Sequence, residues 1–293
     1  MHGYTVFDNN AYKRASVERI RRLAEAERSK RIVGLASVVV LQEMLARARD
    51  ANMERRSVNR AAIRKLGLHC AVPRAGKTIV NFITHTDGQV FQLLRGFLHP
   101  SDSEMFEQLG ELVGTVTEAQ SDDSLAEISD RLAAIESTVT NVEAAYVAGL
   151  GRVWEYTAES NQMKRNLDYA AEIVRRTASY YGEDFAPTDV MPRIIEIAKS
   201  TSIGFALRDS VVAEVRAKRG GHGQHANTVW DEEVVSSTSM YTTVRGKTLL
   251  LVTEEERLLK AAAAAGASDR VCRLADYELR LGLPPWESAG HTP

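Results

Sequence analysis

The chain has 293 residues, of which 44% are hydrophobic and 26% are charged, with a formal net charge of −2. These values are typical of a soluble globular protein with one large domain or two smaller ones. The near-neutral charge excludes bulk cationic attraction as the basis of nucleic-acid binding, which would have to use local patches. The two cysteines, Cys70 and Cys272, form no CxxC pair, so neither a disulfide scaffold nor a thiolate metal site is supported.

The N-terminal segment lacks the uninterrupted apolar stretch of a signal peptide, because Asp8 and many charges between residues 13 and 31 break it. The longest apolar runs are too short to cross a bilayer. A cytoplasmic protein without a membrane partner is therefore expected.

The first 50 residues alternate between strand and helix patterns. Residues 4–8 form an apolar, β-branched run, and a helix over 16–30 follows with Ser16 as its N-cap. Residues 32–36 read as a second strand, after which Ser37 caps a helix that carries Glu43 in its second turn. This order predicts two parallel strands joined by a right-handed crossover.

The middle of the chain, residues 51–225, is predicted to be mostly helical, with helices over 163–179, 190–200 and 203–218. Its clearest element starts at Ser124, which forms a capping-box pattern with Glu127. Apolar residues then recur three and four positions apart, at Leu125, Ile128, Leu132, Ile135, Val139, Val142 and Tyr146. This seam predicts either a stripe that faces the protein core or a contact between subunits.

The C-terminal part returns to the α/β alternation. A helix is predicted over residues 231–243, a strand over 247–253, and a helix over 254–265 that Gly266 ends. A short strand is expected near residues 269–274. The α/β pattern therefore occupies the two ends of the chain.

Four acidic positions stand at strand ends or near helix starts in these terminal parts. They are Asp8, Glu43, Asp231 and one member of the run Glu254, Glu255 and Glu256. In an open α/β sheet, functional groups gather beyond the carboxyl ends of the strands. Carboxylates that meet there repel one another unless a cation neutralises them, and Mg²⁺ prefers oxygen ligands. The pattern predicts a metal-dependent acidic centre, which suits phosphodiester hydrolysis.

Four segments, taken in order, resemble the PIN-domain nucleases, the family that includes the VapC-like toxin ribonucleases. The matching segments are Val6-Phe7-Asp8-Asn9-Asn10, the run from Ser37 through Glu43 to Leu45, the run from Trp230 through Asp231 to Ser237, and Leu249-Leu250-Leu251-Val252-Thr253-Glu254-Glu255. The chain departs from the family in two ways. It has glutamates where the last aspartate is expected, and its interval between Glu43 and Asp231 is much longer.

The resemblance implies a PIN-like parallel-sheet core built from both chain ends, with a mainly α-helical insertion. The expected boundaries are 1–50 for the first part of the core, 51–225 for the insertion, 226–285 for the second part of the core, and 286–293 for a disordered tail.

The resemblance also implies a site. Asp8, Glu43, Asp231 and Glu255 would be the catalytic residues and would hold one or two Mg²⁺ or Mn²⁺ ions. Four further residues would support them. Asn10 would orient Asp8 or touch the substrate, and Thr253 would hold the metal ligands in place by hydrogen bonds. Glu232 could substitute for Asp231, and Glu254 is the alternative to Glu255 as the fourth acid.

The expected activity is endonucleolytic cleavage of RNA, with single-stranded DNA as the alternative substrate. The family also implies a toxin–antitoxin or phage-defence setting, an antitoxin or other regulatory partner, and a homodimer. The rival interpretation is a non-catalytic protein that keeps the fold and assembles through its helical insertion.

Two other patterns compete for a function. Residues 71–78 partly match a phosphate-binding P-loop that ends in Lys77 and Thr78, although a hairpin-like loop is the alternative, since residues 78–84 alternate like a strand. Arginines that would share one helical face predict either a nucleic-acid contact or a solvated surface, and these are Arg49, Arg56, Arg60 and Arg64.

Overall fold

The computed structural model describes residues 3–74, 77–83, 100–119, 123–156, 228–232, 234–235 and 249–286, together with seven residues between 203 and 214. The predicted helices over 163–179 and 190–200 lie outside the described residues, as do residues 287–293 of the expected tail. The helix predicted over 203–218 is described in part, and its described residues are helical.

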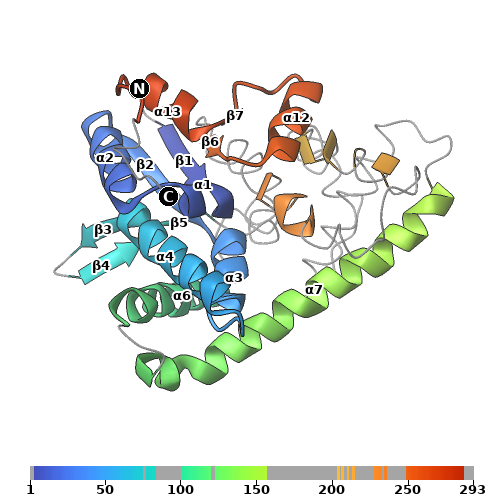
Figure 1. Ribbon diagram of the computed structural model, residues 1–293, viewed down its shortest axis with the longest axis horizontal. Coiled ribbons are helices and arrows are strands. Elements are labelled where there is room, and N and C mark those ends of the chain that lie inside the picture. Colours follow the sequence, from blue (N-terminus) through green and yellow to red (C-terminus); the bar gives the residue numbers. More distant parts are fainter. Residues whose placement is uncertain are drawn as a thin grey trace.

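A five-stranded sheet forms the centre of the protein, and each pair of neighbouring strands in it is parallel (Figure 1). In spatial order its strands are β5 (Phe82–Ile83), β2 (Ile32–Ser37), β1 (Gly3–Phe7), β6 (Leu249–Val252) and β7 (Val271–Cys272). This arrangement confirms the α/β class and the participation of both chain ends. The edge strand β5 comes from the range that the sequence assigned to the insertion.

The pairing of β1 with β6 joins the two ends of the chain. Tyr4 lies opposite Leu249 and Phe7 opposite Val252, so both strands end at the same level. Val6, Leu251 and Val252 are almost completely buried, which is typical of strands covered on both faces. The residues that follow the two strands, Asp8 and Thr253, are therefore brought side by side at one edge of the sheet.

The N-terminal helices begin at the residues that their capping chemistry predicts. They are α1 (Asn9–Arg14), α2 (Val17–Ser29), α3 (Val38–Ala46) and α4 (Met53–Cys70). The hydroxyl of Ser16 accepts a hydrogen bond from the Arg19 amide at 3.1 Å, and that of Ser37 accepts from Val40 at 3.4 Å. Both predicted N-caps are confirmed. Asp8 caps α1 in the same way.

Residues 71–74 and 77–80 pair as antiparallel strands instead of forming the strand and helix of a P-loop. Strand β3 (Ala71–Arg74) pairs with β4 (Lys77–Val80), and Arg74 lies opposite Lys77. A P-loop needs a helix that starts at its lysine, so that backbone amides point at the phosphate. Lys77 lies in a strand here, so the described residues have the geometry of the hairpin alternative and not that of a P-loop.

The apolar seam of the middle region faces the protein's own core in the described residues. A 3-10 helix (Asp123–Ile128) leads into the long helix α7 (Ser129–Tyr156), after α6 (Pro100–Glu118). Four seam residues are buried, namely Leu125, Ile128, Leu132 and Val139, and two more pack against the core, namely Ile135 and Val142. Since α7 packs on α3, the seam is an internal contact, and Leu132 is buried within one chain.

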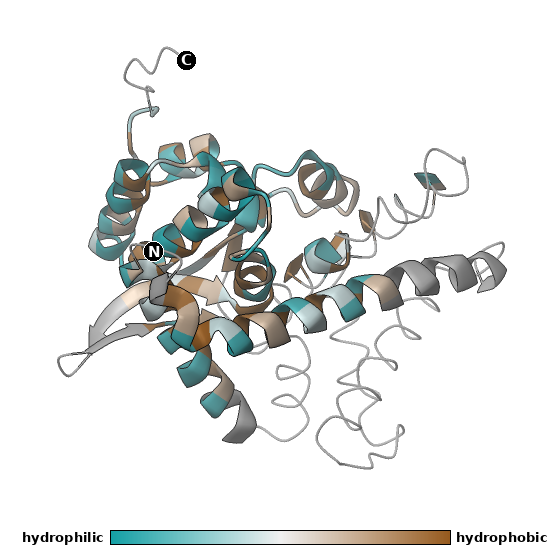
Figure 2. Cartoon of the chain, turned by 60° about the horizontal axis from the view of Figure 1, so that its bottom comes forward, coloured by the Kyte–Doolittle hydropathy of each residue, from teal (hydrophilic) through white to brown (hydrophobic). Residues whose placement is uncertain are grey.

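The C-terminal part contains α12 (Glu256–Ala264) and α13 (Leu274–Arg280). Gly266 follows α12 with a φ of +67°, as the predicted helix stop requires. One boundary was wrong: residues 228–232 are all helical, so the helix starts before Asp231. Hydrophobic residues gather on the sheet and on the helix faces turned toward it, while hydrophilic residues cover the outer faces (Figure 2). None of the helices in the described ranges is long and apolar enough to cross a membrane.

A charged pair is buried under the sheet between α2 and α4. Nε2 of His69 lies 2.8 Å from Oε2 of Glu27, and both residues are almost fully buried. Tyr277 and Thr5 donate hydrogen bonds to the other carboxylate oxygen at 2.6 and 2.7 Å, and the Tyr12 hydroxyl lies 2.8 Å from Nδ1 of His69. The Glu27 carboxylate raises the pKa of His69 well above its usual value, against the opposing effect of burial. A fully bonded pair of this kind fixes the packing of α2 against α4.

Gly34 makes room for this pair, and replacing it with alanine should destabilise the fold. A Cβ atom there would lie 2.9 Å from Nε2 of His69, whose ring is held by Glu27 and Tyr12. We expect Gly34→Ala to lower the free energy of unfolding by about 2–3 kcal/mol, as overpacking does. Urea denaturation would measure the change.

Gly110→Ala is the matched control. Gly110 lies inside α6 with nothing within 4 Å of an added Cβ, so the same substitution should stabilise the protein by roughly 0.5–1 kcal/mol. Equal effects of the two substitutions would show that His69 does not constrain Gly34.

Candidate metal centre

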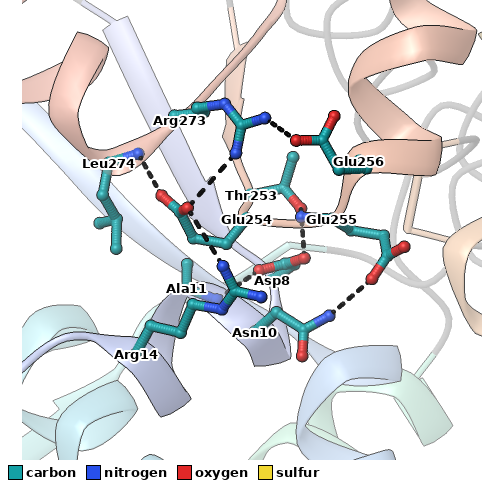
Figure 3. A network of polar contacts seen from close by, with 10 residues as sticks. All are labelled: Asp8, Asn10, Ala11, Arg14, Thr253, Glu254, Glu255, Glu256, Arg273 and Leu274. Atoms are coloured by element: carbon teal, nitrogen blue, oxygen red, sulfur yellow. Dashed lines mark hydrogen bonds and ion pairs between the residues drawn. The ribbon is translucent and has the colours of Figure 1, made fainter.

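Asp8 occupies the carboxyl end of β1 and is held from two sides. Its Oδ1 accepts a hydrogen bond from the Ala11 amide at 2.6 Å, which caps α1, and its Oδ2 accepts from the Thr253 hydroxyl (Figure 3). The residue is only 5% exposed. Asp8 is therefore fixed in place by one local and one long-range contact, across the junction of β1 and β6.

Thr253 connects Asp8 to the glutamate run. Its hydroxyl donates to Asp8 and accepts from the Glu255 amide at 2.9 Å, and the whole residue is buried. Hydrogen bonds of this kind hold the residues that contact a ligand. These two bonds are the contacts that a supporting role of Thr253 would require, and that role stays a prediction.

The three consecutive glutamates point to different partners (Figure 3). Glu254 accepts from the Leu274 amide at 3.0 Å and pairs with Arg14 and Arg273 at 3.7 and 3.6 Å. Glu256 is exposed and pairs with Arg273. Glu255 is the member of the run that binds Asn10 and whose charge acts on Asp8, which favours its register over those of Glu254 and Glu256.

Asn10 supports the site through a contact that differs from the expected one. Its Nδ2 donates to Oε2 of Glu255 at 3.1 Å, so it orients Glu255 instead of Asp8. Lys13 lies one turn further along the same helix, close enough to Asp8 and Glu43 for both carboxylates to influence its pKa. The short helix α1 thus presents an amide and an ammonium group to the carboxylates.

Glu43 enters from α3, the helix that follows β2. Its Oε1 lies 3.8 Å from Nη2 of Arg47, one turn later on the helix. The same Arg47 nitrogen lies 3.3 Å from Oε1 of Glu143, which belongs to the long helix α7. Glu43 therefore lies beside the cation Arg47, which also contacts a second carboxylate, that of Glu143.

Asp231 belongs to the helical residues 228–232. The negative charges of Asp8, Glu255 and Glu43 all act on its pKa, and Arg257 of α12 opposes them. Arg257 also donates to the Thr228 hydroxyl at 2.9 Å, so it anchors the start of this segment. Glu232, predicted as a substitute, is buried next to Asp231. The electrostatic interactions place Asp231 with the other three acids.

Two of the four carboxylic acids have raised pKa values. Loss of water around the buried side chain raises the pKa of Asp8 from 3.8 to about 7, with Glu43 and Glu255 adding to the effect and the bonds from Thr253 and Ala11 opposing it. The pKa of Asp231 is raised well above its usual value for the same reason, reinforced by Asp8, Glu255 and Glu43. A cation bound among these groups would offset the repulsion that adds to the effect of burial on both pKa values.

The donor set suits a hard divalent cation. The four gathered side chains offer only carboxylate oxygens, the ligands that Mg²⁺ and Mn²⁺ take. In the described part of the chain, however, no three His, Cys, Asp or Glu side chains are yet drawn together around one point as metal ligands would be. Holding a metal would thus require the glutamate side chains to turn inward by rotation about their flexible bonds.

Several residues of this site had no sequence signal that pointed to them. They are Lys13, Arg47, Glu143, Trp230 as a hydrogen-bond donor, and Arg257. Lys13 lies three positions after Asn10, a spacing that brings two side chains to one helix face. That spacing was the one available clue. The positions of Glu143 and Arg257 depend on tertiary packing.

Three of the four arginines predicted to face nucleic acid hold helices together. Arg49 donates to the Ser129 carbonyl at 3.1 Å, Arg60 to the Ala48 carbonyl at 2.9 Å, and Arg64 to the Ala119 carbonyl at 2.6 Å. Ala48 and Ala119 lie just beyond the ends of α3 and α6, where carbonyl groups lack helical partners. These contacts give Arg49, Arg60 and Arg64 a structural role. Binding of nucleic acid through this face, including Arg56, stays a prediction.

Comparisons with protein-family models, with curated proteins and with solved structures found no match to this chain.

The raised pKa of Asp8 predicts a pH-dependent stability in the absence of metal. Between pH 4 and 7 the folded protein keeps a proton on Asp8 that the unfolded chain releases. The free energy of unfolding should therefore fall as pH rises through this window, by roughly 4 kcal/mol at most for this group, and Asp231 acts in the same direction. Urea denaturation in EDTA at stepped pH would measure the decline.

Asp8→Asn should make this decline shallower, because the amide oxygen can still cap α1 while no longer titrating. The same substitution at Asp130, an exposed aspartate in the first turn of α7, should leave the slope unchanged. If wild type and Asp8→Asn decline equally, Asp8 titrates normally and the carboxylates are not coupled.

Proposed function

We propose that this protein is a metal-dependent endonuclease with a PIN-like core, which hydrolyses phosphodiester bonds of RNA. The observation that carries the proposal is the electrostatic coupling of four carboxylates from four separate segments, namely Asp8, Glu43, Asp231 and Glu255. Two of them have raised pKa values, which is typical of groups assembled for a function instead of for stability.

The arrangement of the elements supports the same proposal. Asp8 and Glu255 follow the adjacent parallel strands β1 and β6, and Glu43 lies on the helix after β2, the strand on the other side of β1. Ligands of open α/β sheets bind beyond the carboxyl ends of the strands. The segments that resemble the PIN-domain nucleases are the ones that contribute the four acids, in the order in which that family uses them.

Each carboxylate would have a distinct support while it holds one or two Mg²⁺ or Mn²⁺ ions. Thr253 and the Ala11 amide would fix Asp8, Asn10 would orient Glu255, and Arg257 would balance part of the charge near Asp231. When bound, the metal supplies Lewis-acid polarisation of the phosphate and lowers the pKa of the attacking water.

Lys13 is the group best placed to meet the substrate. Burial lowers its pKa, and Arg47 acts in the same direction, while Glu43 and Asp8 oppose them. A positive charge next to the carboxylates would attract the phosphodiester and stabilise the charge that develops on it during in-line attack. The toxin or phage-defence setting stays a prediction of the family resemblance.

Cleavage of single-stranded RNA in Mn²⁺ or Mg²⁺ tests the proposal. The wild type should cut RNA, stop in EDTA, and recover when metal is added back. Asp8→Asn and Asp231→Asn should each lower the rate at least about a hundredfold, because even changes behind the metal ligands cost 10–100-fold. Circular dichroism would establish that the variants are folded.

Two adjacent glutamates provide the matched pair for the same assay. Glu255→Gln should lose activity, while Glu256→Gln should keep it, since Glu256 is exposed and engaged with Arg273. Undiminished cutting by folded Asp8→Asn and Asp231→Asn proteins would rule out the carboxylate centre. Equal loss in the two glutamate variants would rule out the assigned register.

A further inference from the structure

Glu143 of the long helix α7 contacts residues that neighbour the carboxylates. Its Oε1 accepts a hydrogen bond from Nε1 of Trp230 at 2.8 Å and lies 3.3 Å from Nη2 of Arg47. Trp230 is buried and directly precedes Asp231, while Arg47 lies one turn after Glu43. A single carboxylate therefore contacts the neighbours of two of the four acids.

The position of Glu143 follows from the packing of α7. Val139 is buried on the face of α7 that meets the core, and Glu143 stands one turn later on that face. Arg47 is the C-cap of α3, against which α7 packs. Apolar packing between the two helices thus holds the Glu143 carboxylate at the end of α3, where a cation such as Arg47 is also favoured by the helix dipole.

Arg47 stands between two carboxylates and lies closer to Glu143. The same nitrogen is 3.3 Å from Glu143 and 3.8 Å from Glu43. All three side chains are largely shielded from water, with exposures of 22% for Glu143, 16% for Glu43 and 33% for Arg47. A guanidinium group stays charged at any relevant pH, so it competes with a metal ion for whichever carboxylate it contacts.

We infer that Glu143 is a positioning residue of the carboxylate centre: it draws Arg47 away from Glu43, which leaves Glu43 available to a divalent cation, and it fixes Trp230 beside Asp231. The part of the inference that concerns a metal ion rests on the proposed function. The arrangement of Arg47 between Glu43 and Glu143 is independent of that function and can be tested alone.

Binding of Mn²⁺ to the full-length protein, followed by calorimetry, gives the first test. Glu143→Gln keeps an oxygen that can accept from Trp230 but loses the charge that holds Arg47. Arg47 should then shift toward Glu43, and the dissociation constant for Mn²⁺ should rise about tenfold, as it does when supports of metal ligands are removed. Glu136→Gln, an exposed position on the same helix, should leave the affinity unchanged.

Removing the competing cation should reverse the effect. In the double variant Arg47→Gln/Glu143→Gln, Mn²⁺ should bind as tightly as in Arg47→Gln alone. A merely structural role of Glu143 would leave the double variant at least as weak as Glu143→Gln. That result, or an unchanged affinity in Glu143→Gln, would overturn the inference while leaving the proposed function in place.

A metal-free measurement separates the two proposals. In EDTA, Glu43→Gln should lower the urea midpoint more in a Glu143→Gln background than in wild type, because the contact between Arg47 and Glu43 should then be closer. This result in a protein that fails to bind Mn²⁺ would support the positioning of Arg47 and refute the metal centre. An equal shift in both backgrounds would refute the positioning role, whatever the metal does.

Discussion

The parallel pairing of β1 with β6 is the constraint on which the candidate site depends. It joins segments that are 245 residues apart at the contact between Asp8 and Thr253. The strands are held by buried apolar side chains and by a ladder that continues to the bond from the Asp8 amide to the Val252 carbonyl, at 3.0 Å. Because this framework is apolar and hydrogen-bonded, it can hold carboxylates close together although they repel one another. Burial, together with the charges of the neighbouring carboxylates, raises the pKa values of Asp8 and Asp231.

Hydrogen-bond partners decide which acidic side chain enters the site. Glu254 and Glu256 are adjacent to Glu255 in sequence and carry the same group, yet arginines and the Leu274 amide draw both of them elsewhere. Glu255 instead binds Thr253 through its backbone amide and Asn10 through its carboxylate. Three chemically identical residues thereby make three different sets of contacts. The buried pair of Glu27 and His69 is a contrasting case. Both carboxylate oxygens of Glu27 have partners within the fold, and the pair stabilises the packing of the elements around it.

The parts that the sequence predicted correctly are those that local chemistry determines. Ser16 and Ser37 cap their helices because a hydroxyl before an apolar-periodic run satisfies the first free amides, and the strand ends follow from short apolar runs. The four acids were singled out because each lies next to such a local boundary, and their role as metal ligands stays a prediction. Contacts between segments that are distant in the sequence could not be predicted from local patterns. The helical segment before Asp231 starts earlier than predicted, where Arg257 binds Thr228. Asn10 turns to Glu255, and two of the arginines, Arg60 and Arg64, bind carbonyl groups just beyond helix ends.

The middle of the chain cannot be regarded as a module attached to a finished core. The helix α3, which carries Glu43, has seven buried apolar residues distributed around its circumference, so it must be covered on several faces. Both α4 and α7 pack against α3, and β5 extends the sheet beside β2. All three belong to the range that the sequence assigned to the insertion. A core made of the two chain ends alone would leave these faces of α3 in water, at a cost of about 25 cal/mol for each Å² of apolar surface. The backbone that positions Glu43 is therefore fixed by residues up to a hundred positions away, and the insertion is part of what makes the site.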